Sequence, residues 1–155
     1  MKALSMTQPW ASLVILGEKR WETSSWRCAH TGWLAIHAAK SFPAYEQSLC
    51  LRDPWRKALQ GYRVFSAKGL PRGKILGWVW HEGDQHTEDV RVDLPQHELA
   101  VGDYSSGRWA WRLTKPHMLV TPISCVGHLG VWPLPGHIQA YLDGAIQKAE
   151  ARERC

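Results

Sequence analysis

The chain has 155 residues, 45% hydrophobic and 21% charged, and a formal net charge of +5. This length suits one domain over residues 1–155, and no apolar run approaches the roughly 20 residues that a membrane-spanning helix needs. The cysteines, Cys28, Cys50, Cys125 and Cys155, form no C-x-x-C pair. Neither a zinc knuckle nor a disulfide framework is therefore indicated, and we expect reduced thiols in a cytoplasmic protein.

The charges are unevenly distributed along the chain. Between Arg52 and Lys74 seven basic residues accompany one acidic residue, whereas between Glu82 and Asp103 seven acidic residues accompany one basic residue. A polyanion is attracted to the first segment and repelled by the second, so the surface is predicted to have a preferred side for nucleic acid. The alternative is that the two segments neutralise each other across the fold.

The first 26 residues predict a strand, a helix and a second, polar strand. Residues 2–6 suit a short strand, and residues 7–16 suit a helix that Thr7 caps and that has Pro9 in its first turn. Gly17 stands where a left-handed residue ends a helix. Residues 19–26 are expected to be extended, and they are too polar for a core although they carry two indoles.

The middle of the chain alternates between apolar and basic stretches. Residues 32–39 are apolar at nearly every position, which predicts a central strand. Helices are expected within residues 40–51 and from Asp53 to about Leu59, followed by a mobile loop over residues 60–73. Residues 74–82 predict a strand with Trp78 and Trp80 on one face.

The second half predicts further short strands and a terminal helix. Residues 83–102 lack periodicity and suit a long connection with a short strand at 90–94. Strands are expected at 108–113, ended by Pro116, and at 118–123 and 125–133. Residues 137–154 suit an amphipathic helix. Irregular strands mixed with helices indicate an α+β fold, and we expect a small, strongly bent β-barrel with helices packed on its rim.

Two groups of residues resemble a known family. The run Leu4-Ser5-Met6-x-Gln8-Pro9-Trp10-Ala11-x-Leu13, followed by Gly17-x-Lys19-Arg20-x-Glu22 and Ser25-Trp26, closely resembles the opening of the activating signal cointegrator homology (ASCH) domain. The later Trp109-Ala110-Trp111, Pro122-Ile123 and Gly127-x-x-Gly130-x-Trp132 resemble its closing strands. The resemblance implies a PUA-like barrel over residues 2 to about 134, with a cleft that faces nucleic acid and is lined by the Gly-x-Lys-x-x-Glu segment.

Members of this family serve in three roles. Some bind RNA or DNA, some cleave RNA, and one bacterial branch deacetylates acetylated cytidine nucleosides. In that branch a threonine follows the lysine by three positions and an arginine comes two later, whereas this chain has Glu22 and Ser24. These departures count against a simple transfer of the amidohydrolase activity, but a carboxylate can still hold the lysine or polarise a water.

Lys19 is the main candidate site residue. A charged ammonium can hold a phosphate or a base carbonyl, and a lysine partly desolvated between indoles can act as a nucleophile or base. On a regular strand Lys19 and Glu22 project to opposite faces, so the chain must bulge or turn between them if they share a pocket. We predict such an irregularity. The alternatives are a solvated lysine and a surface ion pair of Glu22 with Arg20 or Arg27.

Other candidates are assigned by charge, aromatic surface and chain position. Trp10, Trp21 and Trp26 are cleft candidates for base stacking, whereas Trp33, Trp78, Trp111 and Trp132 are expected in the core. The residues predicted to bind nucleic acid are Gln8, Trp10, Lys19, Arg20, Trp26, Arg56, Lys57, Lys68 and Arg108. The tentative catalytic residues are Lys19 and Glu22, with the hydroxyls of Tyr104, Ser105 and Ser106 as weaker candidates or, alternatively, a polar turn.

No metal or cofactor site is indicated. His81 and His86 are five positions apart, which is not the spacing of a helical metal motif, and His37 suits a bonded core histidine or a side chain in the cleft. We therefore predict no required cofactor. The sequence indicates a nucleic-acid-binding domain, with a small hydrolase of RNA or of a modified nucleoside as the alternative.

Overall fold

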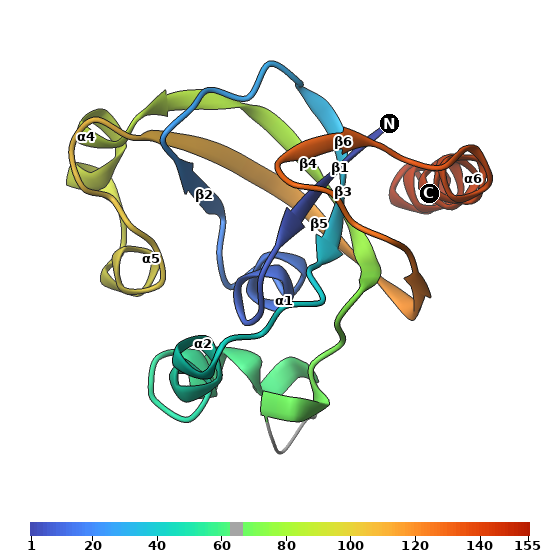
Figure 1. Ribbon diagram of the computed structural model, residues 1–155. Coiled ribbons are helices and arrows are strands. Elements are labelled where there is room, and N and C mark those ends of the chain that lie inside the picture. Colours follow the sequence, from blue (N-terminus) through green and yellow to red (C-terminus); the bar gives the residue numbers. More distant parts are fainter. Residues whose placement is uncertain (63–66) are drawn as a thin grey trace.

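The computed structural model describes residues 1–62 and 67–155, so Arg63 of the basic segment lies outside the described residues (Figure 1). The strands are β1 Lys2–Met6, β2 Trp21–Ser24, β3 Gly32–Ala38, β4 Lys74–His86, β5 Trp109–Ser124 and β6 Val131–Pro133. The helices are α1 Trp10–Ile15, α2 Ala44–Leu49, α3 Trp55–Ala58, α4 Thr87–Val90, α5 Gln96–Ala100 and α6 Gly136–Glu153, with 3₁₀ turns η1 Leu59–Tyr62, η2 Ala67–Gly69 and η3 Arg91–Asp93.

The six strands form one sheet in the order β2-β5-β4-β3-β1-β6. The β1–β3 pair is parallel, and the other pairs are antiparallel. The sheet is strongly curled, with β2 and β6 as its two edges, so it is a half-barrel rather than a closed barrel (Figure 1). The predicted α+β fold with a bent, barrel-like sheet and helices around it is confirmed.

The sheet has a core on each face. On the inner face, Val14 and Ile15 of α1 pack with Leu34 and Ile36 of β3 and with Trp111. On the outer face, α6 packs its buried residues against alternate sheet positions (Figure 1). The outer cluster includes Ala35, Ile75, Trp78, Trp132, Ile138, Leu142 and Ile146. Successive residues of β3 thus serve opposite cores, as the two-residue period of a strand requires.

The first helix begins three residues later than predicted. Thr7 does not cap it, and the residue at the N-cap position is Pro9, which makes no side-chain cap bond. The longer Gln8 side chain takes over, because its Oε1 accepts a hydrogen bond of 3.1 Å from the backbone N–H of Ser12. Gly17 has φ +77°, as expected for a left-handed helix end, and the next residues turn back toward the helix.

Short helices occupy most of residues 87–100 in the acidic segment, which corrects the strand predicted at residues 90–94. β4 continues to His86, beyond the predicted end at Glu82, and α4, η3 and α5 follow it. These helices have three to five residues. They are too short to show a helical period in the sequence, so the pattern gave no signal for them.

The two strands predicted on either side of Pro116 are one strand, β5. Proline is tolerated there because the pairing with β4 is irregular: Thr114 lies opposite Trp80 and His117 opposite Trp78, so the partner strand does not need a proline N–H. Lys115 has φ +49° at this bulge. The strand predicted over residues 125–133 is reduced to β6, and residues 125–130 form a loop.

The helices predicted near residues 40–51 and 53–59 are present but shorter, as α2 and α3. Within the predicted mobile loop, η1 and η2 are ordered turns, and residues 63–66 lie outside the described residues. The terminal amphipathic helix is confirmed as α6. Among the described residues, no helix is long and apolar enough to span a membrane.

Candidate functional site

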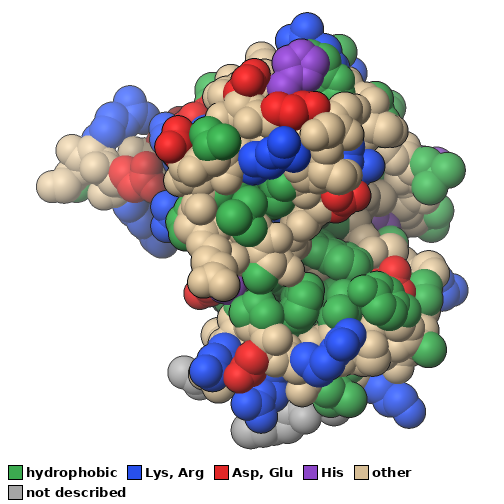
Figure 2. All heavy atoms as spheres, turned by 90° about the vertical axis from the view of Figure 1, so that its left-hand side faces the viewer, with side chains coloured by type: hydrophobic (Ala, Val, Ile, Leu, Met, Phe, Trp, Pro, Cys, Tyr) green, Lys and Arg blue, Asp and Glu red, His purple; other side chains and the backbone are tan. Residues whose placement is uncertain are grey.

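A cavity of about 440 Å³ lies between the turn that precedes β2, the helices α2 and α3, and the connection from α5 to β5. Figure 2 shows this face of the molecule, with a hollow between its upper and lower halves and hydrophobic side chains along the lower border of the hollow. The lining residues are Trp10, Lys19, Glu22, Thr23, Tyr45, Leu49, Trp55, Ala100, Val101, Gly102, Asp103 and Arg108. Indoles, two cations and two carboxylates therefore meet in one concave site.

Lys19 lies at the base of this cavity. Its side chain is only 1% exposed, and its Nζ is 3.9 Å from Oε2 of Glu22. The carbonyl of Leu13 accepts hydrogen bonds from the backbone N–H groups of Glu18 and Lys19, and β2 begins only at Trp21. Lys19 therefore lies at the end of the turn that follows α1 and not on β2. The predicted irregularity between Lys19 and Glu22 is present, and both side chains line the same cavity.

Glu22 provides a carboxyl with altered proton affinity. Burial raises its pKa above the ordinary value, although the nearby charges of Lys19 and Arg108 act in the opposite direction. Its Oε2 is buried and has no hydrogen-bond partner among the described residues. The side chain as a whole is 23% exposed, because the cavity reaches it. Such a carboxyl is suited to exchanging a proton with a guest in the cavity.

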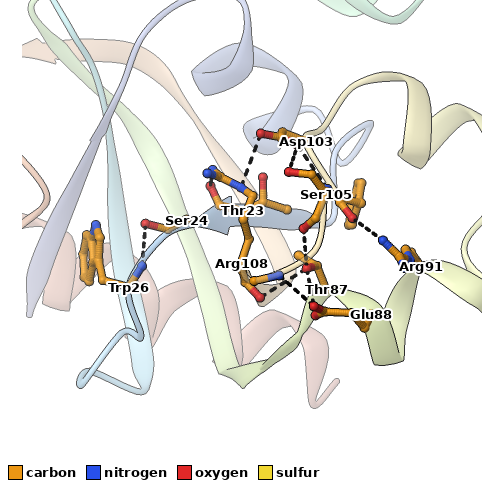
Figure 3. Close-up of polar contacts among 11 residues, drawn as sticks. Thr23, Ser24, Trp26, Thr87, Glu88, Arg91, Asp103, Ser105 and Arg108 are labelled. Atoms are coloured by element: carbon orange, nitrogen blue, oxygen red, sulfur yellow. Dashed lines mark hydrogen bonds and ion pairs between the residues drawn. The ribbon is translucent and has the colours of Figure 1, made fainter.

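Arg108 supplies the second cation. Its Nη2 donates to the carbonyl of Thr23 at 3.2 Å, and its Nε lies 3.4 Å from Oδ2 of Asp103 (Figure 3). Asp103 is fixed in turn by the hydroxyl of Ser105, at 2.7 Å. The Asp103 ion pair is too poorly aligned to satisfy Arg108 Nε, which has no hydrogen-bond partner among the described residues.

Three of the buried side-chain atoms that lack partners belong to residues of this cavity. They are Glu22 Oε2, Trp55 Nε1 and Arg108 Nε, two donors and one acceptor. Because buried polar groups normally find partners within the fold, their convergence on one cavity indicates a site that receives a polar guest.

Glu98 is a site residue that the sequence did not reveal. Its side chain is charged but the residue is only 5% exposed. It accepts hydrogen bonds from the backbone N–H groups of Arg20 and Trp21 at 3.0 to 3.1 Å and from the Tyr104 hydroxyl at 3.3 Å. It thereby holds the chain immediately after Lys19 to α5. The acidic segment offered no signal for this role, because Glu98 is one of seven acids there.

The weaker catalytic candidates do not line the Lys19 cavity. Tyr104 is buried, and burial next to Glu98 raises its pKa, so its hydroxyl keeps its proton. Ser105 binds Asp103 and Ser106 accepts a hydrogen bond from Arg91, and both serines are exposed. The polar-turn alternative describes the two serines better than a role beside Lys19.

The predicted nucleic-acid-binding residues divide into three groups. Trp10 and Arg108 line the cavity with Lys19. Arg56 and Lys57 are exposed on α3, where they pair with Asp53, and Lys68 is exposed on η2. Gln8 and Arg20 are not among the lining residues: Gln8 is buried and bonded to Ser12 and Pro71, and Arg20 is exposed elsewhere.

Trp26 belongs to a neighbouring hollow of about 350 Å³, and its side chain is 43% exposed. This hollow shares Trp10, Glu22 and Thr23 with the Lys19 cavity, so the two are contiguous. The tryptophans expected in the core are buried, except that Trp33 is only partly so. Trp21, a cleft candidate, is instead buried with Val90, Tyr104 and Ala110.

His37 is a bonded core histidine, as one of the two alternatives proposed. It is 2% exposed, its Nε2 donates to the Cys125 carbonyl at 2.9 Å, and its Nδ1 lies 3.2 Å from the Ser5 hydroxyl. Burial lowers its pKa. Within residues 1–62 and 67–155, no three histidine, cysteine or acidic side chains are grouped so that they can hold a metal ion.

Comparisons with known proteins agree with the sequence resemblance. The family model described as "ASCH domain" matches residues 4–120. Activating signal cointegrator 1 of Mus musculus is 29% identical over 135 residues, and the protein of the same name from Homo sapiens is 28% identical over the same length. Each match covers 87% of this chain but 22% of the relative. The chain therefore spans about a fifth of the length of these curated relatives.

The fold is also found in crystal structures of an ASCH protein from Zymomonas mobilis. One has a TM-score of 0.58 at 11% identity, over 92% of this chain and 93% of that chain. A mutant of the same protein has a TM-score of 0.55 at 12% identity, over 93% and 94% of the two chains. At such low identity the similarity concerns the fold alone.

Proposed function

Because this chain belongs to the ASCH domain family, whose model covers residues 4–120, we propose that it is a nucleic-acid-binding domain whose Lys19 cavity accepts part of an RNA or DNA ligand. The observation that carries this proposal is the placement of two cations, the buried Lys19 and the partly exposed Arg108, in a cavity walled by the indoles of Trp10 and Trp55. Cations bind phosphates or base carbonyls, and indoles stack on bases.

The distribution of charge supports the proposal. None of the eight ion pairs between described side chains joins the basic segment 52–74 to the acidic segment 82–103. The two segments therefore do not neutralise each other by direct pairing, which was the alternative to a surface with a preferred side. Arg56 and Lys57 are exposed beside the lining residue Trp55, Lys68 is exposed on η2, and all three can hold phosphates.

The test compares wild type with Lys19→Met, which removes the charge but keeps an unbranched side chain. Labelled single-stranded RNA, single-stranded DNA and duplex DNA are titrated with protein while fluorescence anisotropy is recorded. Loss of one charged contact is expected to weaken binding about 10- to 100-fold. The matched control is Lys148→Met on α6, which removes an exposed charge far from the cavity in the fold.

Wild type and both variants must each show cooperative unfolding before their affinities are compared. Equal affinities of Lys19→Met and Lys148→Met would contradict the proposed role of the cavity. A second check is to neutralise Arg56, Lys57 and Lys68, which is expected to lower affinity and to reduce its dependence on salt.

A hydrolase that uses the same cavity is the second candidate. It is favoured by one observation, the raised pKa of Glu22 beside the Lys19 ammonium, because this pair can exchange a proton at a reacting bond. Incubation with acetylcytidine and with labelled RNA, followed by chromatography, measures turnover. Product that disappears in both Lys19→Met and Glu22→Gln supports this candidate, and retention of RNA without any product refutes it.

A further inference from the structure

A second, larger cavity lies beyond the end of β1. Its volume is about 980 Å³, and its walls come from the end of β3, the residues just before β4, and the loop between β5 and β6. Backbone hydrogen bonds join these walls, from Gly73 N–H to the Ala38 carbonyl at 2.7 Å and from Cys125 N–H to the Gly73 carbonyl at 3.1 Å. The cavity is therefore a fixed feature of the sheet end.

This cavity is lined by cations without acids. Lys40, Arg72 and Lys74 are among its lining residues, His128 adds an ionisable ring, and the lining residues that the structure describes include no aspartate or glutamate. Among the described residues, none of the ion pairs involves Lys40, Arg72 or Lys74. Three uncompensated positive charges around one concavity are suited to a ligand with several negative charges.

The Lys19 cavity, the hollow beside Trp26 and the second cavity adjoin one another in this order, and together they define a path. The Lys19 cavity shares Glu22 and Thr23 with the hollow beside Trp26, and this hollow shares Ser5 with the second cavity. Between the two cationic cavities the path passes the partly exposed Trp26 indole. Cations at both ends and an aromatic surface between them are the arrangement by which proteins hold a single strand: phosphates at the cations and a base on the ring.

We propose that the second cavity binds the phosphates of a single-stranded nucleic acid whose base occupies the Lys19 cavity. This inference rests on the proposed function and makes it more specific, because it identifies the ligand as an oligonucleotide strand rather than a nucleoside or a duplex. A base that enters the Lys19 cavity must be unpaired, and an exposed indole can stack only on an unpaired base. Phosphates further along the strand, beyond the base that stacks on Trp26, then reach Lys40, Arg72 and Lys74.

The experiment measures affinity against strand length. Labelled mononucleotides, single-stranded homopolymers of 2 to about 12 nucleotides, as RNA and as DNA, and duplexes of the longest length are titrated with wild type and with the triple variant Lys40→Gln, Arg72→Gln and Lys74→Gln. The control variant, Lys148→Gln, Arg152→Gln and Arg154→Gln, removes the same charge from α6 and its C-cap residue. Thermal unfolding of each variant confirms that the fold is retained.

We expect wild-type affinity to rise with length until the strand reaches the second cavity, and the triple variant to lose this gain while binding dinucleotides as wild type does. Three lost phosphate contacts change the slope of log affinity against log salt by about 2 for a single strand, so between 50 and 200 mM salt the long strand should lose about 20-fold more affinity with wild type than with the triple variant.

Several results would overturn the inference. Equal length dependence in the triple variant and the α6 control would show that the second cavity holds no part of the strand. A mononucleotide that loses affinity in the triple variant would show a separate nucleotide site instead. If wild type binds a duplex as tightly as it binds the single strand of the same length, the assignment of a single strand fails. Absence of wild-type binding at every length would refute the proposed function itself.

Discussion

Replacement of Glu98 by alanine tests whether a buried carboxylate holds the site together. The change removes the acceptor for three donors, the part-buried backbone N–H of Arg20, the buried backbone N–H of Trp21 and the buried hydroxyl of Tyr104. An unsatisfied buried donor costs about 1–3 kcal/mol. Three of them give a loss of about 4 kcal/mol in the free energy of unfolding, because removal of the carboxylate also relieves part of its own desolvation cost.

The loss can be measured by urea unfolding, followed by tryptophan fluorescence and by far-ultraviolet circular dichroism. At about 2–4 °C per kcal/mol for a domain of this size, the midpoint of thermal unfolding should fall by about 8–16 °C. Glu98→Gln keeps one oxygen that can accept from the two backbone donors, so a smaller loss of about 1–2 kcal/mol is expected.

Asp143→Ala on the exposed side of α6 is the control, and it should change stability by less than about 0.5 kcal/mol. A loss of less than about 1 kcal/mol in Glu98→Ala would refute the reasoning, because it would mean that the three donors find other acceptors. An equally large loss of stability in Glu98→Ala and Glu98→Gln would also contradict the reasoning, because it would mean that the glutamine oxygen does not replace the carboxylate as an acceptor.

Three further substitutions test other parts of the structure. Burial raises the pKa of Glu22, so the charged form of this side chain is disfavoured in the folded state and the free energy of unfolding falls as pH rises above the usual carboxyl range. Glu22→Gln should therefore be more stable than wild type in urea at neutral pH, and this difference should disappear toward about pH 4. A stability difference that does not depend on pH would argue against this reasoning. Gly127→Ala places a Cβ atom closer to Cε1 of His37 than non-bonded atoms can approach, so a loss of about 1–3 kcal/mol is expected in thermal unfolding, and an unchanged midpoint would show that the loop moves freely. Gly144 lies in α6 with no atom within 4 Å of the position of an added Cβ, so Gly144→Ala should raise stability by about 0.5–1 kcal/mol in the same assay, and a lower midpoint would contradict the packing of α6.

The sequence predicted the elements that have a clear period or a clear end signal. The apolar strand at residues 32–39 and the terminal helix were found because their residues alternate or recur on one face over several turns. Gly17 marked a helix end because its left-handed conformation suits glycine. The short helices of residues 87–100 were missed because a helix of four or five residues has no period to detect.

The site was predictable only in its local part. Lys19 and Glu22 are three positions apart, so the sequence could connect them and require a turn. Arg108 is 85 positions away from Thr23, and Glu98 is 78 and 77 positions away from Arg20 and Trp21. The placement of both residues follows from the pairing of β2 with β5 and from the docking of α5. No periodicity carries such long-range information. For the same reason, the sequence could not predict that Lys40, Arg72 and Lys74 line one cavity.

The packing of α6 on the outer face of the sheet has a practical consequence for binding measurements. The Lys19 cavity opens on the side of α2 and α5, whereas α6 and the end of the chain lie on the opposite side of the molecule (Figure 1). A sensor chip, a dye or a fused reporter attached after Cys155 would leave the approach to the cavity open. Coupling through Cys155, the exposed one of the four thiols, therefore presents every molecule with the same face toward the solution.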